Sequence, residues 1–201
     1  MKVHVDLEIE GRKIEEPFRL TGTLNKDVRD AMDRGISATI FNRDLYDDSK
    51  VLMSTVDPSS FVQKIFELDT KTGKTRTVAT GSEEFNYLAA GVDLNTGEPL
   101  IKEQIDTVAG EFWYKVYIKD KATGQWVYHA PLSYKVAERK KIDILGFDTD
   151  PNKLVISTNI NGDKLAAYDY DIKEQKFSTE PLFASENYDI DSAGFTIDRA
   201  N

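Results

Sequence analysis

Hydrophobic and polar residues alternate along most of the chain in short runs, which end at turns rich in Asp, Asn, Thr and Gly. A period of two is the pattern of β-strands that bury one face. The 3.6-residue period of an amphipathic helix is not sustained over any long segment. A helix is predicted only over Lys26–Asp33, where Asn25 can serve as the N-cap. The pattern therefore predicts an all-β fold.

One strand–turn–strand signal recurs at a fixed distance. Asp69, Asp120 and Asp171 lie 51 residues apart, and each begins a turn between two alternating runs. The first two turns contain Thr-Gly, and glycine can adopt the positive φ that short hairpins need. The predicted strands before these turns are Lys64–Leu68, Tyr114–Ile118 and Leu165–Tyr170, and those after them are Thr75–Ala79, Trp126–His129 and Phe177–Thr179.

A second turn precedes each of these hairpins. The strands predicted before it are Ile40–Asn42, Gly91–Asp93 and Gly146–Asp148, and those after it are Val51–Thr55, Pro99–Ile101 and Leu154–Ser157. Each unit thus contains four strands in chain order. Four-stranded antiparallel units with a period of about 50 residues are typical of β-propeller blades.

The predicted fold is a partial β-propeller of about three whole blades, with partial blades at both ends. The boundaries are an N-terminal β-hairpin and short helical linker at 1–36, and propeller blades over 37–201, with whole blades at 37–80, 85–130 and 142–184 and the start of the next blade at 191–198. The hairpin pairs Lys2–Glu10 with Lys13–Leu20, and residues 131–141 are predicted to be a polar connection between blades.

An arc of this kind leaves apolar sheet faces uncovered at its two ends. Complete propellers typically have about four to eight blades that cover one another. We therefore expect the chain either to be a piece of a longer protein or to self-associate.

Composition excludes several classes of function. The 201 residues include no cysteine, which excludes a disulfide scaffold, a thiolate metal site and a cysteine nucleophile. The net charge of −9 argues against nucleic acid or an anionic membrane as the main partner. The sequence has no apolar run near the roughly 18 residues of a membrane span and no signal-peptide pattern. A soluble protein is expected, and its compartment, cytoplasm or periplasm, stays open.

Three stretches in a fixed order point to a known family. They are Arg34–Ile40, Lys64–Lys74 and, most strongly, Ile144–Asn159 followed by Ala167–Asp171. Over about residues 34–198 the chain resembles the N-terminal β-propeller region of prolyl-oligopeptidase-type serine peptidases, in the dipeptidyl-aminopeptidase or acylaminoacyl-peptidase-like branch.

The resemblance implies a propeller that restricts the access of short peptides to a following α/β-hydrolase domain, which carries the Ser, Asp and His of the triad. This sequence lacks the G-x-S-x-G nucleophile elbow of that domain. Its nearest string, Gly35–Thr39, lacks the second glycine. We therefore expect no catalytic residue in this chain, and we expect the hydrolase domain to lie outside it.

The two histidines, His4 and His129, are candidates for a catalytic base. A Ser–His–Asp arrangement needs a serine next to a histidine that a carboxylate orients. The sequence gives neither histidine such partners, so both are expected to be ordinary surface or strand-end residues.

Acidic residues gather in two loops and at one blade entrance. Asp44, Asp47 and Asp48, and likewise Asp148 and Asp150, could offer oxygens to a cation, but turn formation is the simpler interpretation. Glu83-Glu84 could hold a peptide's free amino group, as the resemblance suggests, or be a chance pair in an acidic chain. No metal and no cofactor is expected, and the substrate-binding residues stay unknown.

Aromatic residues cluster at Phe112–Tyr114, Tyr117 and Trp126–Tyr128. They could form a ligand platform, but strand aromatics in a propeller usually fill the core between blades. The basic run Arg139–Lys141 is expected to be a solvated loop.

Three functions remain open at this point. The first is a non-catalytic propeller fragment of a serine peptidase that gates peptide access. The second is a self-standing protein or peptide interaction module, although the Gly-Gly pairs of kelch repeats are absent. The third is a small independent enzyme, for which the sequence offers no triad, metal cluster or phosphate loop.

Overall fold

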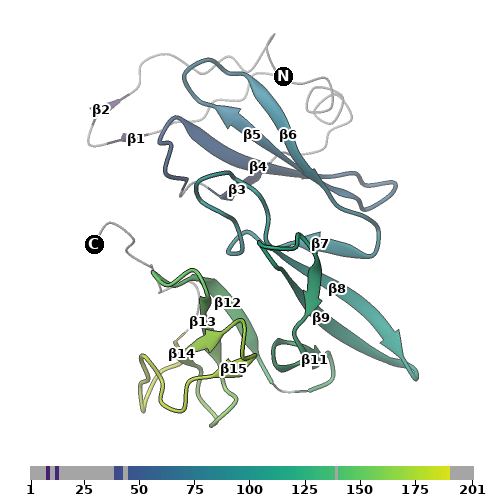
Figure 1. Ribbon diagram of the computed structural model, residues 1–201, viewed down its shortest axis with the longest axis vertical. Helices are drawn as coiled ribbons and strands as arrows, with labels where there is room; N and C mark the ends of the chain where they lie inside the picture. The colour runs from purple at the N-terminus through teal and green to yellow at the C-terminus, as the bar shows by residue number, and fades with distance from the viewer. Residues whose placement is uncertain (1–7, 10–11, 14–38, 43–44, 139, 191–201) are drawn as a thin grey trace.

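Three antiparallel sheets follow one another along the chain, each built on four strands in chain order, and the second has a short fifth strand (Figure 1). The described residues of this computed structural model are 8–9, 12–13, 39–42, 45–138 and 140–190. Neighbouring strands in each sheet are neighbours in sequence, which is the up-and-down order of a propeller blade. The fold is all-β, as predicted, and the three sheets form an open series in the described part of the chain.

The first sheet occupies the upper part of Figure 1 and matches its predicted strands closely. Its strands are β3 (Thr39–Asn42), β4 (Lys50–Val56), β5 (Gln63–Asp69) and β6 (Thr75–Thr80). Leu52 and Ile65 on the two central strands are fully buried. The period-two pattern therefore predicted these strands.

The second sheet contains β7 (Phe85–Tyr87), β8 (Ile101–Val108), β9 (Glu111–Lys119) and β10 (Trp126–Tyr128), and a short β11 (Tyr134–Lys135) also pairs with β9. The prediction of its first hairpin was wrong. Gly91–Asp93 and Pro99 form only one isolated bridge, Val92 to Pro99. The strand that pairs with β8 at this edge of the sheet is β7 instead. The chain after β7 forms a loop that leads into β8.

That loop is held by a close approach of Gly91 to β8. The carbonyl of Gly91 accepts hydrogen bonds from the N–H groups of Leu100 and Ile101. A Cβ atom at position 91 would lie 2.4 Å from the Cβ of Ile101. The segment therefore packs against the start of β8 and cannot form a regular ladder strand beside it.

The third sheet contains β12 (Ile142–Phe147), β13 (Lys153–Thr158), β14 (Ala166–Asp171) and β15 (Lys176–Phe177). β13, β14 and β15 overlap the strands predicted at Leu154–Ser157, Leu165–Tyr170 and Phe177–Thr179, whereas β12 begins four residues before the predicted strand Gly146–Asp148. The register of β12 on β13 shifts between Ile144 and Gly146, which is a β-bulge.

The N-terminal hairpin is described only in part. β1 (Glu8–Ile9) pairs antiparallel with β2 (Arg12–Lys13), in agreement with the predicted hairpin. The predicted helix over Lys26–Asp33 and the predicted strand at 191–198 lie outside the described residues. The domain division at residue 36 stays a prediction.

Three turns with the sequence Asp-x-x-Thr-Gly fold in the same way. In each, the aspartate Oδ1 accepts hydrogen bonds from the backbone N–H groups two and three residues later. The glycines have φ of 68°, 74° and 71°. The turns begin at Asp69, Asp93 and Asp120. In the turn that begins at Asp171, Gln175 occupies the position that glycine has in the other three turns, and its φ is 53°.

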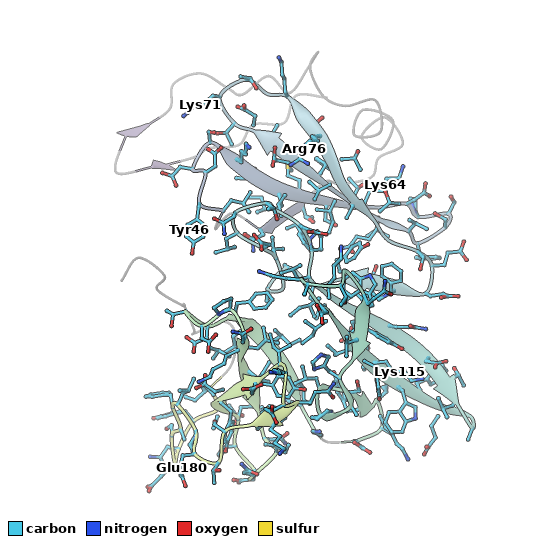
Figure 2. The ribbon with its side chains drawn as sticks, in the orientation of Figure 1. Tyr46, Lys64, Lys71, Arg76, Lys115 and Glu180 are labelled. Carbon is cyan, nitrogen blue, oxygen red and sulfur yellow. The ribbon has the colours of Figure 1, made fainter. Side chains whose placement is uncertain are left out.

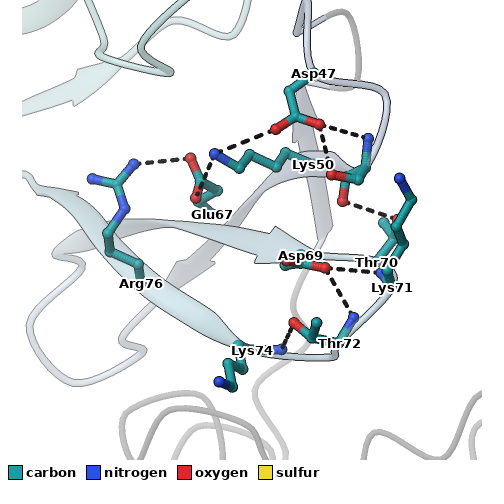
Figure 3. Close-up of polar contacts among 10 residues, drawn as sticks. Asp47, Lys50, Glu67, Asp69, Thr70, Lys71, Thr72, Lys74 and Arg76 are labelled. Carbon is teal, nitrogen blue, oxygen red and sulfur yellow. Dashed lines mark hydrogen bonds and ion pairs between the residues drawn. The ribbon is translucent and has the colours of Figure 1, made fainter.

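Figure 3 shows the Asp69 turn together with an ion-pair group beside it. The carboxylate of Glu67 lies 2.8 Å from Arg76 Nη2 and 3.7 Å from Lys50 Nζ. Asp47 lies on the other side of the Lys50 amine. The pairs of Glu67 with Lys50 and Arg76 join β4, β5 and β6 of the first sheet.

Two apolar clusters hold the three sheets together. The first joins Leu45, Leu52 and Ile65 of the first sheet to Val92 of the second. The larger cluster packs the second sheet against the third, through Ile101, Val116, Ile118, Leu132, Ile144, Leu154, Ile156 and Tyr170. Successive sheets thus pack face to face, as propeller blades do.

The connection at 131–141 contributes to this larger cluster, so its prediction as a wholly polar linker was wrong. A 3-10 helix, η1 (Ala130–Leu132), turns Leu132 inward, where it is fully buried. The hydroxyl of Ser133 then donates a hydrogen bond to the carbonyl of His129 and accepts one from the N–H of Val116. The sequence signal for an inward-facing residue here was the short alternation of Leu132, Tyr134 and Val136, which precedes the charged run at 138–141.

Candidate functional site

A cavity of about 290 Å³ lies where the second sheet meets the third. Most of its lining is apolar, and the lining also includes Glu103, Tyr134 and Asp143. Its apolar lining consists of Leu88, Ala89, Ala90, Val116, Leu132, Ile142 and Ile144. Pockets of this kind, apolar with a few converging polar groups, are the usual form of small-molecule sites.

Strand alternation places Glu103 in this cavity. Ile101 and Glu103 lie two residues apart on β8 and therefore point to the same face, the one that packs against the third sheet. Glu103 pairs across the ladder with Val116 of β9, which also lines the cavity. Among the described residues no side chain or backbone N–H donates a hydrogen bond to the Glu103 carboxylate. Burial raises the pKa of Glu103 above its ordinary value.

Tyr134 and Asp143 come from the two elements that follow the 3-10 helix. Pairing of β11 with β9 sets Tyr134 opposite Tyr114, with ring centroids 5.3 Å apart. Burial raises the pKa of Tyr134, and the negative charges of Glu103 and Asp143 raise it further. The charges of Glu103 and Asp143 therefore both act on Tyr134.

The opposite face of the second sheet carries an aromatic group around one lysine. The Lys102 amine lies 4.2 Å from the ring centroid of Phe85, 4.8 Å from that of Trp126 and 5.4 Å from that of Tyr117. Cation–π contacts of this length stabilise an ammonium group. Burial lowers the pKa of Lys102, and the charge of Glu84 opposes that effect. Figure 2 shows the side chains of this sheet, with Lys115 labelled on β9.

The predicted aromatic core was wrong in its details. None of Phe112, Trp113, Tyr114, Tyr117, Trp126 and Tyr128 is fully buried, and Phe112 is 59% exposed. The core is filled by Ile, Leu and Val side chains and by Tyr170. The β8–β9 hairpin extends beyond the neighbouring sheets (Figure 1), and Phe112 lies next to the turn at its tip, which leaves this ring uncovered.

His129 follows β10, as predicted, but it is a core residue with 1% of its surface exposed. Its Nδ1 lies 2.9 Å from the Tyr170 hydroxyl of the third sheet. Burial lowers its pKa to about 4. The imidazole is therefore neutral near pH 7 and serves as a packed polar group. The other histidine, His4, lies outside the described residues.

The aspartates of the two acidic loops bond to their own turns. Asp47 Oδ1 accepts hydrogen bonds from the N–H and the hydroxyl of Ser49, and Asp150 Oδ1 accepts two from Asn152. These bonds lower the pKa of both carboxyl groups. Turn formation thus accounts for both aspartates. Asp44 lies outside the described residues.

Two further sequence candidates are separate from the cavity. Glu83 and Glu84 are both exposed, and the one described interaction of their carboxylates is the long-range effect of Glu84 on Lys102. Their role at a peptide amino group stays a prediction.

Lys140 donates a hydrogen bond to the carbonyl of Pro131, so it supports the connection between sheets and is more than a solvated charge. Arg139 lies outside the described residues.

Glu103, Tyr134 and Asp143 were not singled out from the sequence. They come from three elements that are distant in the chain, and each alone has an ordinary strand pattern. One weak indication of this site was present in the sequence, because Glu103 is an acidic residue on the same face of its strand as the apolar Ile101.

No family model matches the sequence, and no curated protein matches it. The chain is similar in structure to TolB from Acinetobacter baumannii, with a TM-score of 0.44 and 13% identity over 79% of this chain and 36% of that chain. It is also similar to the Nup133 β-propeller domain of Vanderwaltozyma polyspora, with a TM-score of 0.33 and 9% identity over 74% of this chain and 45% of that chain. The chain thus spans less than half the length of either. The fold assignment rests on the strand order and packing given above.

In the described residues there is no helix with the length and apolar character needed to cross a bilayer.

Proposed function

We propose that this chain is the non-catalytic β-propeller part of a prolyl-oligopeptidase-like serine peptidase, where it gates the access of short peptides to an α/β-hydrolase domain outside the chain. The observation that carries the proposal is the face-to-face packing of three successive four-stranded meanders. Blades that pack in this way form the wall of a propeller.

The resembling stretches add support through their place in the fold. The strongest of them, Ile144–Asn159, forms the β12–β13 hairpin of the third sheet. Lys64–Lys74 forms β5 and the turn that follows it. Each stretch contains one of the two central strands of its sheet, β13 or β5.

The state of His129 supports the non-catalytic part of the proposal. A catalytic base must reach a serine and hold a proton at a working pH. His129 is buried against Tyr170, and its pKa is lowered to about 4. It therefore fits a structural role.

The test compares this chain with its complete reading frame. We expect the frame to continue past the codon for Asn201 and to encode a G-x-S-x-G segment. We expect a fluorophosphonate probe to label the full-length protein and to leave this chain unlabelled. A frame that ends at Asn201, or labelling of this chain alone, would contradict the proposal.

A second candidate is a self-standing module that binds a protein or peptide. The aromatic face around Lys102 favours it, because Phe85, Trp126 and Tyr117 present partly exposed rings on one side of a sheet. Under this candidate the frame ends at Asn201, and Trp126→Ala weakens the binding of the partner peptide. Unchanged binding by that variant would remove this candidate.

Self-association is also part of the proposal for the isolated chain. Large apolar side chains are exposed on the first sheet at Ile40 and Phe61, and beside the third sheet at Leu182 and Phe183. Exposed apolar patches commonly mark association surfaces. Light scattering after size exclusion is expected to give a dimer or larger species, and a monomer at high concentration would contradict this.

A further inference from the structure

The loop between β13 and β14 contains an asparagine followed directly by a glycine, Asn161 and Gly162 (Figure 1). This dipeptide occurs once in the 201-residue sequence. The backbone nitrogen of a residue that follows asparagine is placed to attack the side-chain carbonyl carbon and close a five-membered ring. Glycine favours this attack, because it has no Cβ to obstruct the approach and its backbone is the most adaptable.

Both reacting groups are accessible in the folded chain. Asn161 and Gly162 are exposed, and the Asn161 side chain has no hydrogen bond to any other described residue. The N–H of Gly162 donates a single bond, to the carbonyl of Asn159, over 3.3 Å. That distance is longer than in most backbone hydrogen bonds. The nucleophile and its target are therefore only weakly held.

Other asparagines of the chain lack this combination. Asn159 lies in the same loop, but its Oδ1 accepts a hydrogen bond from the N–H of Lys141 over 2.8 Å, and Ile160 follows it. Asn95 is exposed in a turn and is followed by Thr96. Isoleucine and threonine are branched at Cβ, which crowds the neighbouring backbone nitrogen. Asn159 and Asn95 are therefore comparison sites within the same molecule.

We propose that Asn161 is a site of spontaneous deamidation that needs no enzyme. The Gly162 nitrogen forms a bond to Cγ of Asn161 and gives up its proton, and the side-chain amide nitrogen leaves with that proton as ammonia. The product is a cyclic succinimide. Water then adds to one of its two carbonyl carbons and opens the ring, which leaves aspartate or isoaspartate at position 161. One ammonia leaves and one water enters, and nothing is oxidised or reduced.

The reaction changes the charge and the backbone of this loop. Either product adds one negative charge to the −9 of the chain, next to Asp163 and Lys164. Isoaspartate also inserts one methylene group into the main chain. The ladder pair Thr158–Ala166 closes the loop, and the N–H of Leu165 is held by Asp189 Oδ1, so the change lies outside the β13–β14 ladder. The site is contained in this chain and does not depend on the peptidase assignment.

The experiment follows the full chain over several weeks at physiological temperature, at about pH 7.5 and at about pH 9. Samples are acidified and then digested briefly with trypsin, which cleaves after Lys153 and Lys164 and so places Asn159 and Asn161 in one peptide. We expect fragment masses to show a gain of about 1 Da at Asn161 and none at Asn159 or Asn95. The gain should be faster at the higher pH, because loss of the Gly162 amide proton is assisted by base. Methylation by an isoaspartyl methyltransferase should detect isoaspartate as the larger product.

A single substitution tests the role of the glycine. A Cβ at position 162 would have its nearest neighbour, the Lys164 nitrogen, at 4.0 Å, and φ of Gly162 lies outside the left-handed region. Gly162→Ala should therefore fold normally and slow the mass gain at Asn161 by about tenfold or more. Lys164→Arg is the matched control, because it changes an exposed residue of the same loop and keeps its charge, the tryptic site and the Asn-Gly pair. Its rate should equal that of the wild-type chain.

Four results would overturn the proposal. The first is the absence of a mass gain at Asn161. The second is an equal gain at Asn95 or Asn159, which would remove the special role of this loop. The third is an unchanged rate in Gly162→Ala. The last is aspartate as the sole product, since direct hydrolysis of the side chain gives aspartate without a succinimide.

Discussion

His129 Nδ1 and the Tyr170 hydroxyl lie 2.9 Å apart and connect the second sheet to the third. Both residues are almost completely buried, and their rings meet edge to face with centroids 5.8 Å apart. The contact lies within the largest apolar cluster, which also contains Tyr170. A neutral histidine and a tyrosine thus satisfy each other's polar atoms where water has no access.

Stability should fall in mild acid because of His129. Its pKa is about 4 in the folded chain, against 6.5 for an ordinary histidine. A lowered folded pKa gives stability that is fully present above the unfolded value and is lost as the pH falls from 6.5 toward 4. Between pH 7.5 and pH 5 the contribution of this group should decrease by about 2 kcal/mol.

Urea unfolding followed by tryptophan fluorescence measures this effect. Carboxyl groups also titrate in this interval, so the comparison is with His129→Gln, which keeps a polar side chain and does not titrate. The wild-type chain should lose about 2 kcal/mol more than the variant. An equal loss in both would show that His129 does not carry the pH dependence.

Tyr170→Phe should destabilise the chain through a lost hydrogen bond. The substitution keeps the ring and leaves His129 Nδ1 buried without a partner. The free energy of unfolding should decrease by about 1–3 kcal/mol. Tyr188→Phe is the control, since Tyr188 is 73% exposed, and its effect should stay within about 0.5 kcal/mol. Similar effects of the two variants would contradict the buried contact.

Leu132→Ala tests whether the connection between the sheets is part of the core. Leu132 is fully buried among residues of both sheets, so its truncation should cost about 2–5 kcal/mol. Val136→Ala lies in the same connection at a position that is 49% exposed and should cost about 0.5 kcal/mol or less. Chemical denaturation of the two variants gives the difference. A small effect of Leu132→Ala would show that the segment does not pack as described.

Gly91→Ala should lower the free energy of unfolding by more than a Gly→Ala substitution at a position with open space around it. The new Cβ would lie 2.4 Å from both Cβ and Cγ1 of Ile101, a fully buried residue, so the loop or β8 must move. Overpacking of this kind costs about 1–3 kcal/mol or more. Thermal unfolding measures the change.

Gly124→Ala separates this clash from backbone strain. Gly124 has φ 71°, and no neighbouring atom lies within 4 Å of the position that a Cβ would take. Its substitution therefore reports only the cost of the left-handed conformation, about 1–2 kcal/mol. A milder effect at position 91 than at position 124 would contradict the close approach of Gly91 to β8.

The strands of the first and third sheets could be predicted from the sequence because each lies next to a turn rich in Asp, Asn, Thr or Gly, although β13 (Lys153–Thr158) is buried on both faces and so has no single buried face. Leu52 and Ile65, for example, lie in the predicted strands Val51–Thr55 and Lys64–Leu68 and are fully buried. The strands of the second sheet were harder to predict from the sequence. Its loop at Gly91–Asp93 has the same local pattern as a strand, and only the approach to Ile101 shows that it is not one.

The sequence by itself determined the all-β class, the 51-residue repeat and the Asp-x-x-Thr-Gly turns, because these depend on contacts between residues that are near in the chain. Tertiary structure alone decided the burial of His129, the inward position of Leu132 and the gathering of Glu103, Tyr134 and Asp143 around one cavity. These features arise where one sheet packs on the next. The periodicity of a strand specifies which face is buried, but it carries no information about which distant residues will meet that face.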